Sequence, residues 1–217
     1  METPHSRDVE LDILQATRRS LHGVAELVLA GPQFERSRHI ELRVTTGGFG
    51  TTHEPDLRVE GCDLVAGGQK IAMDGRSLTD LAAAVGLTAR ALDDVYSEGP
   101  GLSESDVVTL DPEATQVLCR ALSTGDAALT LLAPDRPRVL WPEHFDVAIE
   151  LDEVNYGVSP GDGFCGEPYA YVGPWSFDRP ADDFWNAPFG AARTMRELGD
   201  VPPVLSFFAD GRRRSTL

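Results

Sequence analysis

Hydrophobic positions in the first fifth of the chain follow two different spacings. Across residues 8–30 apolar side chains recur mostly at helical intervals, and Gly31-Pro32 follows as a stop signal. This pattern predicts an amphipathic helix. Across residues 39–46 apolar and polar side chains alternate, which is typical of a half-buried strand, and the glycine-rich stretch 47–50 is expected to end it.

The middle of the chain predicts a hairpin followed by helices. Residues 57–65 and 69–73 flank a glycine turn and are expected to pair antiparallel. An Ala-rich helix is expected to begin after Ser77 and to run through Ala84, and its continuation past Gly86 to Tyr96 is left open. Residues 111–132 predict another helix, with Asp111 as its cap and a break at Gly125.

The last third of the chain returns to strand-like spacing. Residues 145–151, 154–158 and 169–172 each predict a strand, and turn residues separate them. A short helix is expected over 188–198 and a last strand over 204–209.

This order of elements indicates the fold class. Strands cluster early and late with helices between them, which argues against regular βαβ alternation and for an α+β fold with an antiparallel sheet and packed helices. The chain has 217 residues, 41% hydrophobic and 25% charged, which is ordinary globular composition. We therefore expect a single domain over residues 1–217.

The charge balance narrows the classes of partner. The chain carries 35 acidic against 19 basic residues, for a net charge of −16, and such a field repels phosphate backbones and anionic lipid surfaces. Residues 77–96 locally resemble a bacterial helix-turn-helix, but Asp93, Asp94 and Glu98 oppose DNA contact there. We expect neither nucleic acid nor a membrane as partner. The acidic surface indicates solubility, or alternatively a protein-interaction module for a basic partner.

The sequence also suggests a compartment. The N-terminal segment has no apolar signal core, and no run approaches the roughly 18 apolar residues of a membrane span. The three cysteines are widely spaced and odd in number, which does not favour a disulfide framework. We expect a cytoplasmic protein.

The densest polar cluster lies in the segment 141–153. If residues 144–152 form a strand, His144, Asp146, Glu150 and Asp152 share one face while the apolar residues share the other. Histidine beside carboxylates suits a divalent metal or general acid/base catalysis, so His144, Asp146 and Glu143 are the candidate catalytic residues. A solvated strand face is the alternative interpretation.

Two further histidines extend the metal hypothesis. His39 and His53 would join His144 if their strands are neighbours, with Glu41 or Asp146 as the carboxylate ligand. The spacing specifies neither the metal nor any cofactor.

A glycine-rich loop over residues 157–168 lies between two predicted strands. It lacks the Gly-Lys-Ser/Thr ending of a phosphate loop and no helix follows it. Aromatic residues concentrate around it: Tyr156, Phe164, Tyr169, Tyr171, Trp175, Phe177, Phe184, Trp185 and Phe189. Such residues beside a flexible loop favour a small-molecule pocket. The candidate ligand-binding residues are Asn155, Tyr156, Ser159, Asp162, Glu167, Tyr169, Trp175 and Trp185.

The chain resembles other proteins in four sequence motifs. They are Trp-Pro-Glu-His-Phe-Asp-Val-Ala-Ile from Trp141, Asn-Tyr-Gly-Val-Ser-Pro-Gly-Asp from Asn155, Glu-Pro-Tyr-Ala-Tyr-Val-Gly-Pro-Trp from Glu167 and Phe-Trp-Asn-Ala-Pro-Phe-Gly-Ala from Phe184. In these the chain resembles uncharacterised actinobacterial proteins of unknown function. The resemblance covers most of the chain and implies no catalytic residues.

The sequence therefore leads to three functional hypotheses. The first is a small-molecule-binding protein whose pocket is edged by the 141–153 strand, the 157–168 loop and the nearby aromatics. The second is a metal-assisted hydrolase or isomerase that uses His144 with Asp146 or Glu143. The third is an acidic protein-interaction module.

Overall fold

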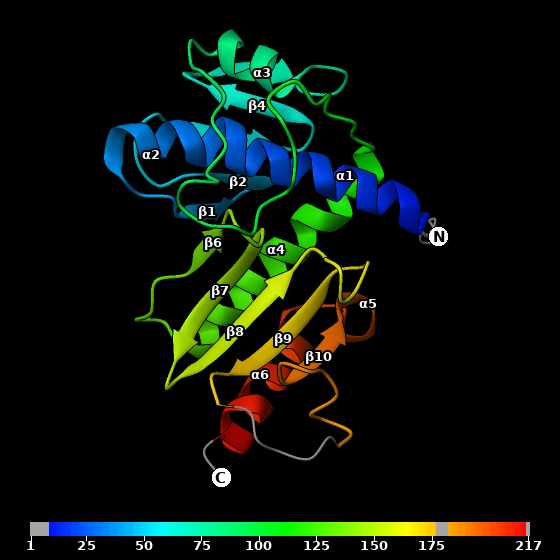
Figure 1. Ribbon diagram of the computed structural model, residues 1–217. Coiled ribbons are helices and arrows are strands. Elements are labelled where there is room, and N and C mark those ends of the chain that lie inside the picture. Colours follow the sequence, from blue (N-terminus) through cyan, green and yellow to red (C-terminus); the bar gives the residue numbers. More distant parts are fainter. Residues whose placement is uncertain (1–8, 177–181, 216–217) are drawn as a thin grey trace.

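The computed structural model describes residues 9–176 and 182–215, and within these ranges ten strands form one antiparallel sheet (Figure 1). The strand order is β10-β9-β8-β7-β6-β1-β2-β3-β4-β5. The strands are β1 Leu42–Thr45, β2 Gly48–Thr51, β3 Leu57–Glu60, β4 Asp63–Ala66, β5 Gln69–Ala72, β6 Val139–Trp141, β7 Asp146–Leu151, β8 Val154–Ser159, β9 Tyr169–Pro174 and β10 Ala191–Thr194.

Helices pack on this sheet, so the expected α+β class is confirmed. They are α1 Leu11–Gly23, η1 Val24–Ala30, α2 Gly31–Ser37, α3 Leu78–Ala84, α4 Pro112–Leu132, α5 Met195–Leu198 and α6 Val201–Ser215. None of the helices in the described residues is both long and apolar enough to cross a membrane.

The N-terminal helix continues past the expected stop at Gly31-Pro32. A π-helical segment, η1, joins α1 to α2, and Pro32 lies in the first turn of α2. Pro32 has no backbone N–H and cannot donate an i→i−4 hydrogen bond, and the π-helical segment immediately precedes it. Gly31 is needed for packing, because a Cβ there would lie 2.1 Å from the carbonyl oxygen of Arg90.

Strand β1 ends before the glycine-rich segment, as expected, and after a turn at Gly47 that segment forms a second strand, β2. Its glycines allow close approach to β3, since a Cβ on Gly48 would lie 2.1 Å from the carbonyl oxygen of Val59. The segment 57–65 is divided into β3 and β4 by a turn at Gly61. The hairpin turn at Gly67-Gly68 is confirmed between β4 and β5.

The helix expected from Ser77 through Ala84 is confirmed as α3, and the continuation to Tyr96 is not formed. The Ser77 side chain accepts a hydrogen bond from the Asp80 backbone N–H at 3.0 Å and caps α3, as predicted. The helix ends at Ala84, however. The buried Glu26 carboxylate accepts hydrogen bonds from the Leu92 backbone N–H and the Tyr96 hydroxyl, which hold the following segment in an irregular conformation.

Helix α4 begins after Asp111, as predicted, but Gly125 does not divide it. Gly125 lies where α4 crosses the sheet, and a Cβ there would lie 2.7 Å from Val158 and 3.1 Å from Val147. This glycine therefore serves helix–sheet packing rather than helix termination.

The C-terminal elements differ most from the prediction. Strand β10 and the short helix α5 replace the helix expected over 188–198, and the expected strand 204–209 lies inside α6. Val204, Phe207 and Phe208 lie at helical spacing and are buried, so they form the side of α6 that packs against the core. Strand β6 was not predicted.

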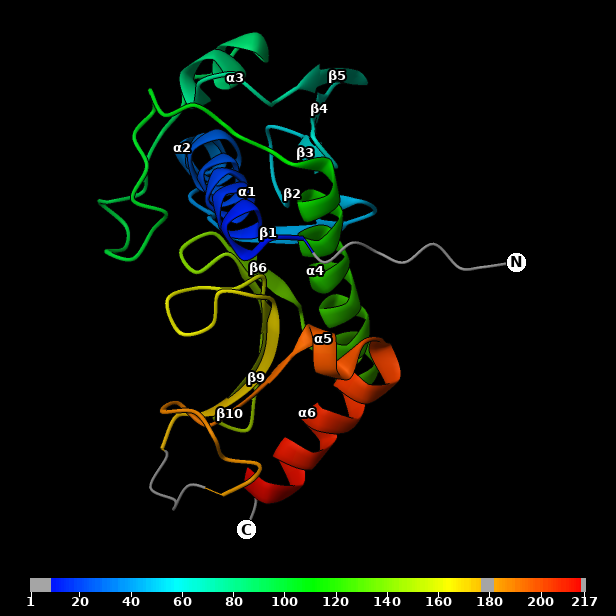
Figure 2. The same cartoon turned by 90° about the vertical axis from the view of Figure 1, so that its right-hand side faces the viewer.

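The C-terminal half of the sheet has two different faces (Figure 2). Helices α4 and α6 lie against one face, and the opposite face is concave and bordered by loops. Along β8, Val154, Tyr156 and Val158 are buried toward the helices, so Asn155, Gly157 and Ser159 point to the concave face. The candidate site lies on this second face.

Candidate functional site

Strand β7 places Asp146 on the concave face. Val147, Ile149 and Leu151 pack toward the helices, and Asp146, Ala148 and Glu150 alternate with them, as expected for an extended segment.

His144 does not belong to that strand face, which corrects the prediction. It lies in the turn before β7, where Phe145 has a left-handed backbone conformation with φ of 54°. The exposed ring of His144 lies 3.5 Å from the Glu98 carboxylate and 3.2 Å from the Glu143 carboxylate. Asp152 also leaves the strand and lies in the β7–β8 turn.

A row of residues across three strands holds Asp146 in place. Ala148 of β7 pairs with Gly157 of β8, which pairs with Tyr171 of β9. The Tyr171 ring lies over Gly157, so closely that a Cβ on Gly157 would lie 2.5 Å from the ring carbon Cζ. Crossing β8 in this way, the Tyr171 hydroxyl reaches β7 and donates a hydrogen bond to Oδ2 of Asp146.

The carboxyl group of Asp146 is buried and only half satisfied. The residue is 6% exposed, and its Oδ1 atom has no hydrogen-bond partner in the ranges 9–176 and 182–215. Burial raises the pKa of Asp146 to about 6, against the opposing effects of the Tyr171 hydrogen bond and the nearby His144. Asp146 is therefore poised to accept a further donor.

A second tyrosine–aspartate pair lies beside the first. The Tyr169 hydroxyl donates to Oδ2 of Asp162 at 2.5 Å. Oδ1 of Asp162 accepts from the backbone N–H groups of Phe164 and Cys165, at 2.8 and 3.1 Å. These hydrogen bonds shape the loop 160–168, so both Asp162 oxygens are engaged within the protein.

Four aromatic rings gather around these pairs: Phe164, Tyr169, Tyr171 and Phe189. The Tyr169 and Tyr171 centroids are 6.3 Å apart, and Phe189 lies 6.3 Å from Tyr171 and 5.0 Å from Phe164. Phe164 is 48% exposed, so the cluster is open to solvent at that end.

Helix α1 supplies a cation to the site. The Nη1 atom of Arg18 is buried and has no hydrogen-bond partner among the described residues. It points toward the loop, 3.1 Å from the position that a Cβ on Gly161 would take. Burial lowers the pKa of Arg18, and the nearby Asp162 counteracts this effect.

One turn further along α1, His22 lies on the floor of the site. Its Nε2 atom is 2.7 Å from the carbonyl oxygen of Pro142, and its ring stacks on Phe145 with centroids 5.4 Å apart. Burial lowers the pKa of His22 to about 4, so the ring is neutral at physiological pH.

Together these groups line a cleft of about 990 Å³. Its lining includes eight of the candidate catalytic and ligand-binding residues: Glu143, His144, Asp146, Asn155, Ser159, Asp162, Tyr169 and Trp175. The cleft is bordered by the loop 160–168 rather than 157–168, since residues 157–159 belong to β8.

Three of the predicted ligand-binding residues are not among those that line the cleft. Tyr156 points to the core face of β8 and packs against Phe208 of α6, with centroids 6.1 Å apart. The Glu167 carboxylate pairs with the Arg196 guanidinium at 2.8 Å. Trp185 is buried, 4.8 Å from the Phe184 ring. Phe177 lies outside the described residues.

Sequence reasoning assigned no role to Arg18 or His22 of α1, and it noted Tyr171 only as one aromatic among several. Tyr171 lies two residues after Tyr169, and residues at that spacing on a strand share a face. The sequence could therefore have placed Tyr171 on the same face as Tyr169. No local pattern connects α1 with β7, so Arg18 and His22 could not be found from spacing.

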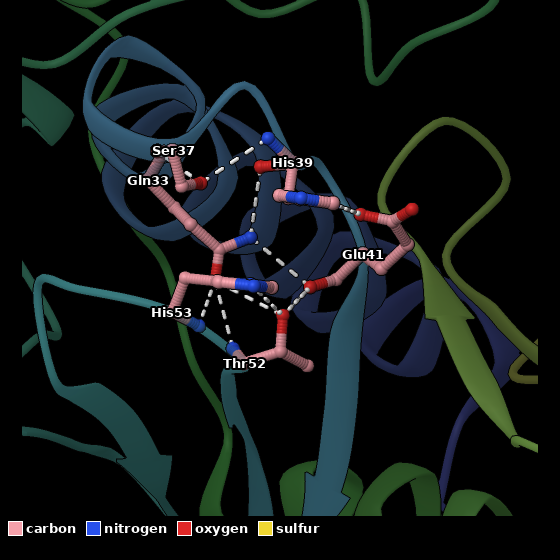
Figure 3. Close-up of polar contacts among 6 residues, drawn as sticks. All are labelled: Gln33, Ser37, His39, Glu41, Thr52 and His53. Atoms are coloured by element: carbon pink, nitrogen blue, oxygen red, sulfur yellow. Dashed lines mark hydrogen bonds and ion pairs between the residues drawn. The ribbon is translucent and has the colours of Figure 1, made fainter.

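His39 and His53 do meet, as Figure 3 shows, but with their rings stacked at 4.3 Å and an interplanar angle of 3°. Parallel rings at this separation cannot both direct in-plane nitrogen lone pairs at one ion. Within the described residues no group of three or more His, Cys, Asp or Glu side chains is placed to hold a metal. The geometry therefore gives no specific support to a metal centre at these histidines or at His144.

The contacts around these histidines are structural. The buried Gln33 amide accepts from the backbone N–H groups of Thr52 and His53 and donates to the carbonyl oxygens of His39 and Glu41, at 2.7–3.0 Å (Figure 3). This side chain therefore fastens α2 to the segments around β1 and β2.

Comparison of the chain with protein-family models, with curated proteins and with solved structures gave no match.

Proposed function

We propose that this protein binds a small polar organic molecule in the cleft formed by β7, β8, β9, the loop 160–168 and α1. The observation that carries the proposal is the Oδ1 atom of Asp146, which is buried, borders the cleft and lacks a partner in the described part of the chain. An unsatisfied buried acceptor costs about 1–3 kcal/mol. A bound molecule that donates a hydrogen bond to Oδ1 would recover this free energy.

The shape and lining of the cleft support the same proposal. Its volume of about 990 Å³ lies at the upper end of the range of about 300–1,000 Å³ that is usual for small-molecule sites. The lining combines aromatic rings such as Tyr171 and Phe189 with a few buried polar groups, which is the usual composition of such sites.

A ligand-observed NMR screen of polar metabolites tests the proposal. Asn155→Trp should fill the cleft, because Asn155 is an exposed strand residue in its lining. Gln69→Trp on the exposed edge strand β5 is the matched control. We expect metabolite binding by the wild type and Gln69→Trp, and its loss in Asn155→Trp. Equal binding by all three proteins, or no binding by the wild type, would refute the proposed function.

A further inference from the structure

The cleft contains two charged side chains of opposite sign that do not satisfy one another. Asp146 Oδ1 and Arg18 Nη1 are both buried, and neither has a hydrogen-bond partner in the described residues. Both side chains border the same cleft. A buried charged atom without a hydrogen-bond partner carries a desolvation penalty, so such atoms are normally paired. A ligand that pairs with both would remove two penalties at once.

Asp162 does not already perform this role for Arg18. Its oxygens accept three hydrogen bonds within the loop and from Tyr169, so its lone pairs are largely engaged. Asp162 attracts the guanidinium of Arg18 through space but leaves Nη1 without an acceptor.

The aromatic cluster favours a cation beside Asp146. The hydroxyls of Tyr169 and Tyr171 both donate to carboxylates, an arrangement that increases the electron density of their rings. Electron-rich ring faces attract ammonium groups, and more strongly where the contact is shielded from water. Because Oδ1 of Asp146 needs a hydrogen-bond donor, an ammonium that carries N–H groups suits it better than a quaternary one.

From this arrangement we infer that the ligand is a zwitterion of the amino-acid class, with its ammonium on Asp146 beside the Tyr171 ring and its carboxylate on Arg18. The inference rests on the proposed function and specifies the ligand chemistry. A molecule with only one of the two charges would leave either Asp146 or Arg18 unpaired.

The test uses matched sets of four compounds that share one apolar body. Each set contains an amino acid, its amide, the corresponding acid without the amino group, and the amide of that acid. Phenyl, indolyl and isobutyl bodies cover different sizes, and affinities are measured by titration calorimetry. Charge-assisted hydrogen bonds of about 1.5–3 kcal/mol correspond to roughly 10-fold to 100-fold in affinity. We expect the zwitterion to bind at least about tenfold more tightly than either singly charged relative.

Two variants test which protein residue binds each charged group of the ligand. Asp146→Asn should remove the preference for the amino group and keep that for the carboxylate, and Arg18→Gln should do the reverse. Asp135→Asn and Arg36→Gln, both exposed and outside the residues lining the cleft, control for net charge. The control variants should retain both preferences.

The outcomes separate the inference from the proposed function. If the compounds bind without regard to charge, or if Asp146→Asn and Arg18→Gln leave both preferences intact, the zwitterion assignment is wrong while ligand binding stands. If neither these sets nor the metabolite screen yields any binding to the cleft, both the inference and the proposed function fail.

Discussion

Replacement of Gly157 by alanine tests how Asp146 is positioned. A Cβ on Gly157 would lie 2.5 Å from Cζ and from the hydroxyl oxygen of Tyr171, closer than real Cβ contacts occur. The ring must then move away from β8, and its hydroxyl loses Asp146. Gly157→Ala is therefore expected to disturb the site although the residue has no side chain.

The expected cost follows from these two contacts. Overpacking of a filled space costs about 1–3 kcal/mol. Loss of a hydrogen bond to a charged group costs about 1.5–3 kcal/mol, and relaxation of the strands recovers part of the total. We expect Gly157→Ala to lower the free energy of unfolding by about 2–4 kcal/mol. Most of that cost should disappear when the Tyr171 ring is absent.

Urea unfolding of a double-mutant cycle measures this dependence. The cycle comprises the wild type, Gly157→Ala, Tyr171→Ala and the double variant. Gly163→Ala is the control, because no atom lies within 4 Å of the Cβ position of this loop glycine. We expect a coupling energy of at least about 1.5 kcal/mol. If Gly157→Ala costs the same with and without the Tyr171 ring, the account of how Asp146 is held is wrong.

Three further predictions concern stability. Burial raises the pKa of Asp146 from 3.8 to about 6, so the contribution of this residue to the free energy of unfolding falls by about 2–3 kcal/mol as pH rises from 4 to 7.5; in urea unfolding, the difference between Asp146→Asn and the wild type should grow by that amount over this range, and a pH-independent difference would contradict it. Burial lowers the pKa of His22 from 6.5 to about 4, so its contribution falls by up to about 3 kcal/mol as pH drops through the same window; because the two contributions oppose each other in the wild type, the stability of His22→Gln should fall more steeply with rising pH than that of the wild type, and an unchanged pH dependence would disprove this. Gly125→Ala should lower the free energy of unfolding by about 1–2 kcal/mol, because the new Cβ would lie 2.7 Å from Val158 and this clash outweighs the better helix propensity of alanine. An increase in melting temperature would refute this prediction.

Local signals explain the parts of the fold that the sequence predicted correctly. The strands β7, β8 and β9 follow from alternation, and the caps at Ser77 and Asp111 follow from side chains that satisfy helix N–H groups. The prediction failed at 204–209, because a short apolar run fits a strand and a buried helix face equally well. It failed at Gly31-Pro32 because packing against Arg90 and a π-helical segment override a local stop signal.

The candidate site could be predicted only where it depends on one strand. Alternation along β8 places Asn155 and Ser159 on one face and Tyr156 on the other. Tyr156 was predicted to bind the ligand because it is aromatic, although its place in the alternation indicates the core face. The contact between Tyr171 and Asp146 depends on register across three strands. The approach of Arg18 depends on how α1 packs beside the loop. Neither is encoded in the spacing of nearby residues.

The most direct test of the central claim is an NMR titration of the Asp146 carboxyl carbon, with and without the amino acid that binds most tightly. We predict a pKa of about 6 in the free protein, because the carboxyl group is buried and half satisfied. Binding should lower this pKa by at least about one unit, since an ammonium on Oδ1 stabilises the carboxylate. A free-protein pKa near the ordinary value for aspartate, or a pKa that the bound amino acid leaves unchanged, would contradict the account.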